Sequence, residues 1–349
     1  MANSAMTEAQ GRAALDALAV YGTITDAAEA LGIPRNTFDS RVKKARRMNL
    51  DGDREFEVEE LPSELPTAAQ LLERRREQFA RKAAVKEART LVPVKVKIDG
   101  PFGLALGGDP HLDDNGTDIA LVEEHIRLIN KTEGMLAGNV GDYSNNWIGR
   151  LARLYGQQST SAAESWVLVE WFIRAVPWLF LIGGNHDLWS GDGDPIKWMA
   201  KQARVSYEAN GMRLGLTTPK GRVIRLNARH DFSGRSQWNT AHGVAKAAQG
   251  GWRDHLLVAG HTHQGGYQIV RDPSSGLLSH CLRVSSYKTY DRYADEKGLP
   301  NQSISPCPIA VIQPDAADDS TRLVTIFHDV ETGADFLTFL RKRKSQRAA

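Results

Sequence analysis

Two kinds of hydrophobic pattern divide the chain. Over residues 1–50 the apolar positions follow a helical period, with one helix around residues 13–19, a second opening at Thr25 and a third over residues 35–47. Gly32 and Pro34 lie between the last two helices, where glycine accepts a left-handed backbone and proline fits a first helical turn. The pattern predicts a small all-α domain. Its expected packing residues are Ala28, Leu31, Gly32, Ile33, Phe38 and Val42.

The expected third helix is strongly basic, with six Lys and Arg residues against the single acid Asp39. Together with the Ala28-to-Gly32 spacing, this resembles a helix-turn-helix, whose recognition helix reads base edges at its start and binds phosphates further along. DNA is therefore the expected partner, and a small bundle with a solvated basic face or a protein-docking module is the alternative. The expected DNA-contacting residues are Arg35, Asn36, Thr37, Ser40, Arg41, Lys43, Lys44, Arg46 and Arg47.

Residues 51–90 lack the pattern of a packed domain. Seven acids and two prolines between positions 51 and 66 predict an extended linker, and helical composition returns over residues 68–89. That helix is expected to be a solvated basic connector, with a second DNA-contacting surface as the alternative. From residue 91 onward, short apolar runs end in glycine and polar residues. The chain is therefore divided into residues 1–50, 51–90, an α/β domain at 91–340 and a basic tail at 341–349.

Composition excludes several classes of protein but does not indicate a binding partner. The chain has 349 residues, 41% of them hydrophobic, and a net charge of +2. Two cysteines are too few for a disulfide framework, so both are expected to be reduced and buried. The most apolar stretch, residues 167–182, contains Glu170 and Arg174, which argues against a membrane span. No secretory signal is recognisable, so a cytoplasmic protein is expected.

Five strand-like runs of the second domain each lead into a polar block, and four of the five blocks contain glycine. Glycine permits a sharp turn there, and the carboxyl ends of strands in open α/β folds meet at one edge of a sheet. We therefore expect the polar side chains to gather at one sheet edge. The blocks are Gly107-Gly108-Asp109-Pro110-His111, Gly141-Asp142-Tyr143-Ser144-Asn145-Asn146, Gly183-Gly184-Asn185-His186-Asp187, Arg229-His230-Asp231 and Gly260-His261-Thr262-His263.

These blocks contain seven nitrogen or oxygen donors of the kind that bind divalent metals. The set has no thiolate, which suits Mn, Fe, Ni, Zn or Mg, and it is too large for one tetrahedral ion. Two ions sharing a bridging ligand would fit, and such pairs promote displacement at phosphorus. His230 is preferred to His242 because it ends a strand-like run. The candidate ligands are Asp109, His111, Asp142, Asn185, His230, His261 and His263.

In their order, the five blocks resemble those of the calcineurin-like metallophosphoesterase superfamily over about residues 95–340. The resemblance implies a four-layer α/β/β/α sandwich and two divalent metal ions, with manganese expected first. It places Asp109, His111 and His263 on one ion and Asn185, His230 and His261 on the other. Asp142 would bridge both ions. His186 would protonate the leaving group, and Asp187 would orient its ring.

Details of the blocks favour one branch of this superfamily. The second block lacks the Asp-Arg-Gly of phosphoprotein phosphatases, and the third ends in Asp187 rather than Glu. Gly-Asn-His-Asp resembles the phosphodiesterase and DNA-nuclease branches, and the domain pairing resembles prokaryotic or bacteriophage proteins, which act in the host cytoplasm. The resemblance thus implies hydrolysis of phosphodiesters, chiefly in DNA, by attack of a metal-bridging hydroxide. The alternatives are hydrolysis of a small nucleotide or phosphate ester, and a DNA-binding regulator with a sensor-like phosphoesterase domain.

Three tryptophans follow the second, third and fourth blocks, namely Trp147, Trp189 and Trp238. They are candidates for stacking on substrate bases, and the alternative is that they close the hydrophobic core. Four arginines of the same loops are candidates for phosphate contact. Helix-turn-helix proteins often dimerise on two half-sites, but the sequence does not determine whether this protein is a dimer. The four arginines are Arg150, Arg153, Arg229 and Arg235.

Overall fold

The computed structural model describes residues 6–51, 64–188, 194–290, 295, 298 and 306–348. Its contacts group the chain into two compact units, residues 1–76 and 77–349, each with its own packing. Within the described ranges, none of the helices combines the length and the apolar character needed to cross a membrane.

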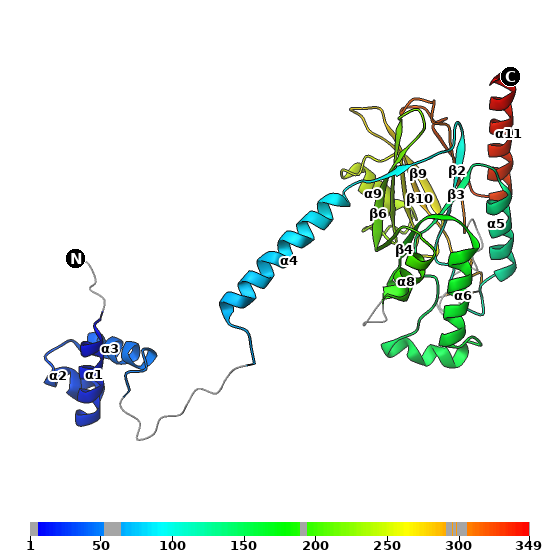
Figure 1. Cartoon of the computed structure of the whole chain (residues 1–349). Coiled ribbons are helices and arrows are strands. Elements are labelled where there is room, and N and C mark those ends of the chain that lie inside the picture. The colour runs from blue at the N-terminus through cyan, green and yellow to red at the C-terminus, as the bar shows by residue number, and fades with distance from the viewer. Residues whose placement is uncertain are drawn as a thin grey trace. The chain divides into compact units, whose positions relative to one another are not determined.

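Three helices form the packed part of the first unit (Figure 1), α1 (Glu8–Tyr21), α2 (Ile24–Ala30) and α3 (Arg35–Arg47). Phe38 and Val42 of α3 are buried against small alanines of α1 and α2. The second helix begins one residue earlier than expected, because the Thr23 side chain accepts the Asp26 backbone N–H at 3.2 Å and caps it. Leu31, expected in the core, is 41% exposed because it lies at the C-cap of α2.

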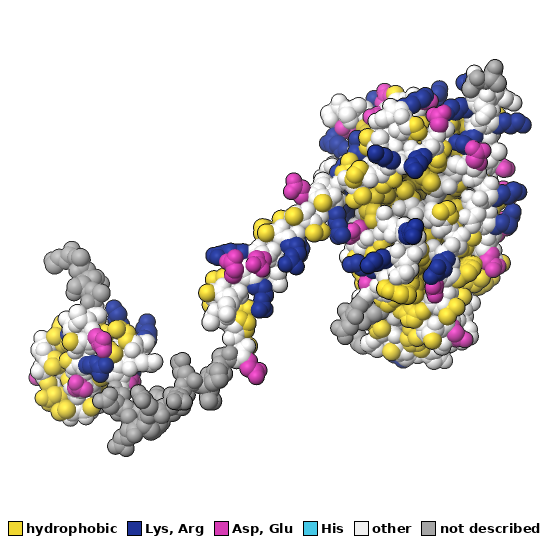
Figure 2. All heavy atoms as spheres, viewed as in Figure 1, with side chains coloured by type: hydrophobic (Ala, Val, Ile, Leu, Met, Phe, Trp, Pro, Cys, Tyr) yellow, Lys and Arg dark blue, Asp and Glu magenta, His cyan; other side chains and the backbone are white. Residues whose placement is uncertain are grey.

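The helix α4 (Ala68–Ala88) has no buried residue. Figure 2 shows basic and hydrophobic side chains mixed along its surface, and Leu72 and Phe79 are among its exposed apolar residues. The exposure of this helix fits the expected solvated connector and its alternative, a second DNA-contacting surface, equally well. Most of the acidic linker, residues 52–63, lies outside the described residues.

Two six-stranded sheets form the body of the second unit. The β2 sheet has the strand order β12-β11-β2-β3-β4-β5, and the β7 sheet has the order β1-β6-β7-β8-β10-β9. The elements are β1 (Val92–Lys95), β2 (Phe102–Gly107), α5 (Ile119–Lys131), β3 (Met135–Asn139), η1 (Gly149–Gln157), α6 (Ala162–Ala175), β4 (Trp178–Gly183), α7 (Asn185–Leu188), α8 (Pro195–Gln202), β5 (Tyr207–Ala209), β6 (Gly211–Thr217), β7 (Val223–Arg229), α9 (His242–Gln249), β8 (Leu256–Ala259), β9 (Gly266–Arg271), β10 (Leu278–Arg283), β11 (Ile309–Ile312), β12 (Val324–Phe327) and α11 (Val330–Ala348).

The two sheets pack face to face through their apolar side chains. Alternate residues of β2, such as Leu104 and Leu106, belong to a core shared with Leu214 and Leu226 of the β7 sheet. The opposite face of the β2 sheet packs on α5, α6, α8 and α11, while α9 covers β8 and β10 of the other sheet (Figure 1). The four-layer α/β/β/α arrangement is thereby confirmed. It fits the all-buried strand β2, which has no solvent-facing side.

The strands that precede the five polar blocks lie in both sheets. β2, β3 and β4 run parallel in the β2 sheet, whereas β7 and β8 run parallel in the β7 sheet. The expectation of a single sheet edge is therefore wrong. The blocks meet instead across the layer between the sheets, at the carboxyl ends of strands from both.

The basic run at the end of the chain continues α11 instead of forming a separate tail. Arg341 donates to the Pro101 carbonyl oxygen at 3.0 Å and pairs with Glu133, and Lys344 pairs with Asp99. These contacts attach the end of the helix to the loop before β2. At least two of the basic side chains therefore have a structural role beyond solubility.

Candidate metal centre

The structure brings all seven candidate ligands together. Three groups of side chains offer ligand atoms that lie within 4.8 Å of one another. His111 belongs to two of the groups and Asp142 to two, so the groups form one continuous centre. The groups are Asp109 with His111 and His263, His111 with Asp142 and His186, and Asp142 with His230 and His261.

The first group gathers the ends of β2 and β8. The Nε2 atoms of His111 and His263 lie 3.1 Å apart, and the buried Asp109 carboxylate accepts the backbone N–H of His261 at 2.7 Å. This hydrogen bond connects the first polar block to the last one. Two imidazoles and a carboxylate directed at one point form a donor set suited to a borderline divalent ion.

The second group surrounds Nε2 of His230. That atom lies 2.8 Å from Oδ1 of Asn185, 3.0 Å from Nδ1 of His261 and 3.3 Å from Oδ2 of Asp142. The other ring nitrogen, Nδ1, donates to the Val140 carbonyl oxygen at 2.8 Å, since a carbonyl can only accept. In the neutral ring Nε2 therefore presents its lone pair to the cluster, as a metal ligand must.

Glycines at the strand ends allow the backbone to approach the carboxylates closely. A Cβ atom on Gly260 would lie 2.2 Å from Oδ2 of Asp109, and one on Gly184 would lie 2.1 Å from Oδ1 of Asp142. Both distances are far below van der Waals contact, so a side chain at either position would displace a candidate ligand. The close approach explains why these two blocks have glycine at positions 260 and 184.

Five candidate ligands have a left-handed backbone, with φ between 39° and 73°. This conformation is uncommon for residues other than glycine, although Asp and His adopt it more readily than most. Such strain persists only where the surrounding structure fixes the turn, and it concentrates at functional sites. The five residues are Asp109, His111, Asp142, His261 and His263.

The electrostatics of the centre favour a charged pair of Asp142 and His230 and a neutral His111 ring. Burial opposes ionisation of Asp142, but the hydrogen bond and the charge of His230 outweigh it and lower the pKa of that carboxyl. Burial likewise opposes a charged His230, yet its contact with Asp142 raises its pKa to about 10. Burial, followed by the charge of His263, lowers the pKa of His111 well below its usual value, so this ring is neutral near pH 7. A neutral imidazole is the form that binds a metal.

Buried polar atoms at the centre support the same interpretation. Oδ1 of Asp109, Nδ1 of His111 and Oδ1 of Asn145 are buried and have no hydrogen-bond partner among the described residues. Buried polar atoms are normally paired, because an unpaired one costs about 1–3 kcal/mol. The orphaned atoms and the surrounding acceptors fit divalent metal ions, which would compensate these costs.

Three consecutive residues after β3 contact His186. The Asn145 carbonyl oxygen accepts from Nδ1 of His186 at 2.5 Å, and Nδ2 of Asn146 donates to the His186 carbonyl oxygen at 2.6 Å. The Trp147 ring packs edge-on against the imidazole at a centroid distance of 5.4 Å. Because Nδ1 bears a hydrogen, Nε2 is the atom available for proton transfer, and it lies 4.0 Å from Oδ2 of Asp142.

Asp187 has a different role from the one expected. Its carboxylate accepts the backbone N–H groups of Asp142 at 2.8 Å, Tyr143 at 3.1 Å and Gly184 at 2.8 Å. The carbonyl of Asn145, not Asp187, is the acceptor for the His186 ring. Asp187 thus fixes the turn that presents Asp142. Burial and the nearby Asp142 charge raise the pKa of Asp187 to about 7.

The candidate substrate-contacting residues are scattered. Trp147 is half-buried beside His186, Trp238 is 93% exposed, and Trp189 lies outside the described residues. Arg229 lies over the rings of Phe232 and Trp252, and Arg235 pairs with Asp231 at 2.8 Å. Arg153 is exposed, and the side chain of Arg150 lies outside the described residues. Among the described members, only Trp147 contacts the centre directly.

Sequence reasoning missed two cations near the centre. Arg283 of β10 is buried, pairs with Asp231 at 3.0 Å, and donates to the Gly260 carbonyl oxygen just before His261. Lys288 lies against Trp147, with its ammonium 5.9 Å from the ring centroid. Neither residue belongs to a recognisable motif, and only the packing of β10 and the following segment brings them here.

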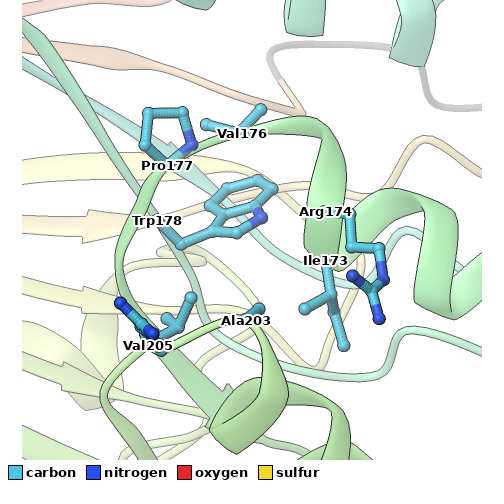
Figure 3. Close-up of a pocket in the computed structure, with 8 residues that line it drawn as sticks. Ile173, Arg174, Val176, Pro177, Trp178, Ala203 and Val205 are labelled. Carbon is cyan, nitrogen blue, oxygen red and sulfur yellow. The ribbon is translucent and has the colours of Figure 1, made fainter.

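A separate hollow of about 520 Å³ lies at the start of β4, and Figure 3 shows the residues that line it. The metal centre follows the opposite end of this strand. The hollow is formed by the end of α6, the start of β4 and the residues after α8, and Trp178 and Arg174 line it. Because β4 has six residues, the two ends are about 17 Å apart. The hollow is therefore no part of the metal centre.

No family model and no curated protein matches the chain. Among solved structures, Vps29 of Chaetomium thermophilum is similar at 12% identity and a TM-score of 0.32, over 65% of this chain and 92% of that one. The nuclease MPE of Pseudomonas putida is similar at 13% identity and a TM-score of 0.30, over 62% of this chain and 84% of that one. Because both similarities are low, only the residues of the centre bear on its chemistry.

Proposed function

We propose that the protein is a two-metal phosphoesterase that hydrolyses phosphodiester bonds, with DNA as its substrate. The observation that carries the proposal is the position of Asp142, which belongs to a group with His111 and to a group with His230 and His261. One carboxylate shared by two sets of nitrogen and oxygen donors is the arrangement that a metal pair requires. Bound divalent ions, manganese first among the candidates, would supply an activated water and neutralise charge at the phosphoryl group.

The residues around the metal positions would supply the proton for the leaving group and fix the orientation of Asp142. His186 holds its Nδ1–H on the Asn145 carbonyl, so that a ring protonated at both nitrogens would give its Nε2–H to the departing oxygen. Burial, as the largest influence, lowers the pKa of His186, while the Asp142 charge opposes that shift. Asp187 holds the turn of Asp142 through two backbone N–H groups of that turn. These contacts fix the acid and the bridging ligand relative to each other before substrate binds.

DNA as the substrate is supported by the surface of α3. Phe38, Val42 and Ala45 face the core of the first unit, which leaves the basic positions on the outer side. A hollow of about 560 Å³ on that side is lined by Ser40, Lys43, Lys44 and Arg47 among others. Exposed Lys and Arg side chains on one helical face are what binding to a phosphate backbone requires.

The test compares the full-length protein, loaded with manganese, on end-labelled single- and double-stranded DNA, an aryl phosphodiester and an aryl phosphomonoester. Asp142→Asn and His186→Ala are the variants expected to lose cleavage of DNA, and His328→Gln, an exposed histidine, is the control. Cleavage of DNA by the wild type and the control only is the expected result. Turnover of the small esters without cleavage of DNA would identify a small phosphate ester, and not DNA, as the substrate. No turnover of any substrate would contradict the proposal.

A further inference from the structure

The loops of the first and second polar blocks run side by side. Three backbone N–H groups of the first loop donate to successive carbonyl oxygens of the second, from Asp109 to Gly141 at 2.8 Å, from His111 to Asp142 at 3.1 Å and from Leu112 to Tyr143 at 2.9 Å. Asp113 continues this pairing with its side chain, since its Oδ1 accepts the backbone N–H of Asn145 at 2.7 Å. The loop that bears Asp109 and His111 therefore also holds Asn145.

The carboxylate of Asp113 is buried and accepts hydrogen bonds on both of its oxygens. Besides the Asn145 N–H on Oδ1, Oδ2 accepts from the Ser165 hydroxyl of α6 at 2.6 Å and from Nε2 of Gln158, the residue after η1, at 3.1 Å. A buried carboxylate is costly unless such hydrogen bonds compensate the loss of water. The three donors therefore fix the orientation of the Asp113 carboxylate.

Gln158 holds the side chains of the same segment. Its Oε1 accepts from Nδ2 of Asn145 at 2.9 Å and from Nε1 of Trp147 at 3.0 Å. Its Nε2 donates to Asp113 and to the Thr160 carbonyl oxygen at 2.9 Å. Donors therefore surround the amide oxygen and acceptors surround the amide nitrogen, so the amide has one orientation. Asp113 and Gln158 together hold Asn145 by its backbone and by its side chain.

The orientation of the His186 ring depends on this segment. Nδ1 of His186 donates to the Asn145 carbonyl oxygen at 2.5 Å, and the Trp147 ring packs edge-on against the imidazole. Asn145 thus accepts from His186 while its own N–H is held by Asp113. A displacement of about 1 Å at a catalytic group can cost about a hundredfold in rate, so the anchor of Asn145 bears on proton transfer.

We propose that Asp113 and Gln158 are positioning residues for the proton donor His186. They hold the Asn145 carbonyl where it keeps a hydrogen on Nδ1 of the ring and leaves Nε2 for the leaving-group oxygen. The inference rests on the proposed phosphoesterase function. It also names the substrates that need this arrangement, which are phosphodiesters with a poor, alkyl leaving group such as the sugar oxygen of DNA. Because Asp113 follows His111 in one loop, the donor is fixed relative to the first metal group.

The first measurement compares kcat of the full-length, manganese-loaded protein on an alkyl and an aryl phosphodiester. Asp113→Ala is expected to lower kcat on the alkyl ester by about a hundredfold. The loss on the aryl ester should be far smaller, because its departing oxygen needs little protonation. Asp113→Asn keeps an oxygen for the Asn145 N–H and should retain most of the activity. Gln158→Leu should show the same selectivity at a smaller size, and it decides the result if Asp113→Ala does not fold.

Asp254→Ala is the matched control for a loss of stability. Asp254 is also buried and pairs with Arg213 at 2.7 Å, but it precedes β8, whereas the metal centre follows that strand. Both alanine variants should have lower melting temperatures, and only Asp113→Ala should select between the esters. Bound manganese is measured for each variant. An equal loss on both esters in Asp113→Ala and in Gln158→Leu would overturn the inference.

The second measurement does not depend on activity. Protein labelled with the heavy nitrogen isotope in histidine, and loaded with diamagnetic zinc, reports the tautomer of His186 through the shifts of its ring nitrogens, and His186→Ala identifies the signals. Wild type and Asp113→Asn should carry the hydrogen on Nδ1, whereas Asp113→Ala and Gln158→Leu should show mixed tautomers. Unchanged signals in both would overturn the inference and leave hydrolysis intact. The expected change of tautomer in a protein that hydrolyses no ester would contradict only the proposed function.

Discussion

The backbone N–H of His186 donates to Oδ1 of Asp142 at 2.9 Å, while Nε2 of the same histidine lies 4.0 Å from Oδ2 of that carboxylate. The residue shared by the metal groups therefore also fixes the expected proton donor. Because the first contact uses the backbone, replacement of the His186 side chain leaves it in place. The two functions of the centre, metal binding and proton donation, can thus be separated by mutation.

We expect His186→Ala to lower kcat by about 10² to 10⁴ on substrates with poor leaving groups, because general acid catalysis contributes that much. An aryl ester with a good leaving group should lose far less, since its departing oxygen needs little protonation. Steady-state kinetics on an alkyl and an aryl phosphodiester would measure the difference. The manganese content should stay that of the wild type. An equal loss on both esters would show that His186 does not act as the acid.

Removal of metal should destabilise the wild-type protein, because ligands that bind only the folded state add to its stability, by about 2.7 kcal/mol at a hundredfold excess over Kd. Melting temperatures with manganese and with a chelator would measure this. Asp142→Asn removes the carboxylate that both metal groups share, so its melting temperature should respond little to manganese. A variant that responds as the wild type does would contradict the shared role of Asp142.

Gly260→Ala and Gly184→Ala should weaken metal binding about ten- to a hundredfold, the usual cost of disturbing groups that orient metal ligands. The physical reason is that the new Cβ atoms would lie 2.2 Å from Asp109 and 2.1 Å from Asp142. Gly156→Ala is the control, since nothing lies within 4 Å of a Cβ there. Calorimetric titration with manganese compares the three variants. Wild-type affinity in both site variants would show that the close approach is unimportant.

His280 should make the folded protein less stable in acid. It is buried beside Tyr267, and burial lowers its pKa to about 4. The unfolded chain takes up a proton near pH 6.5 and the folded one only near pH 4, so stability falls as the pH drops through this window. The loss reaches about 3 kcal/mol at most. Urea unfolding of metal-free protein at pH 7 and 4.5 should show a smaller difference for His280→Gln than for the exposed-site control His328→Gln.

Lys44→Gln and Arg47→Gln should each reduce the salt dependence of DNA binding by the full-length protein. Each phosphate contact contributes about 0.9 to the slope of log affinity against log salt, so the double variant should lose nearly two. Fluorescence anisotropy at several salt concentrations gives the slope. Lys220→Gln, an exposed lysine of the second unit, is the control. Unchanged slopes in the α3 variants would place DNA binding elsewhere or exclude it.

Local patterns predicted the helix α3 to the residue and the five strands to within one residue at each end. The helix α3 begins and ends at residues 35 and 47 as expected, and the five strand-like runs are β2, β3, β4, β7 and β8. Both cysteines are free and buried, as expected. Apolar periodicity and turn residues depend on neighbours in the chain, so a single sequence contains this information. The predicted start of α2 and the predicted burial of Leu31 were wrong. Thr23, and not Thr25, caps the helix, and Leu31 lies at the C-cap, where its side chain is exposed.

The sequence by itself determined which residues could bind metal, since donor type and the glycines of four of the five blocks are local properties. Only the tertiary structure decided that the blocks come from two sheets, that Asp187 holds the turn of Asp142, and that Asn145 holds the His186 ring. The tertiary structure alone also brings Lys288 beside Trp147. These relationships join segments from about 40 to more than 140 positions apart in the chain. They depend on how strands pair and sheets stack, which is a property of the whole packed core and of no single segment.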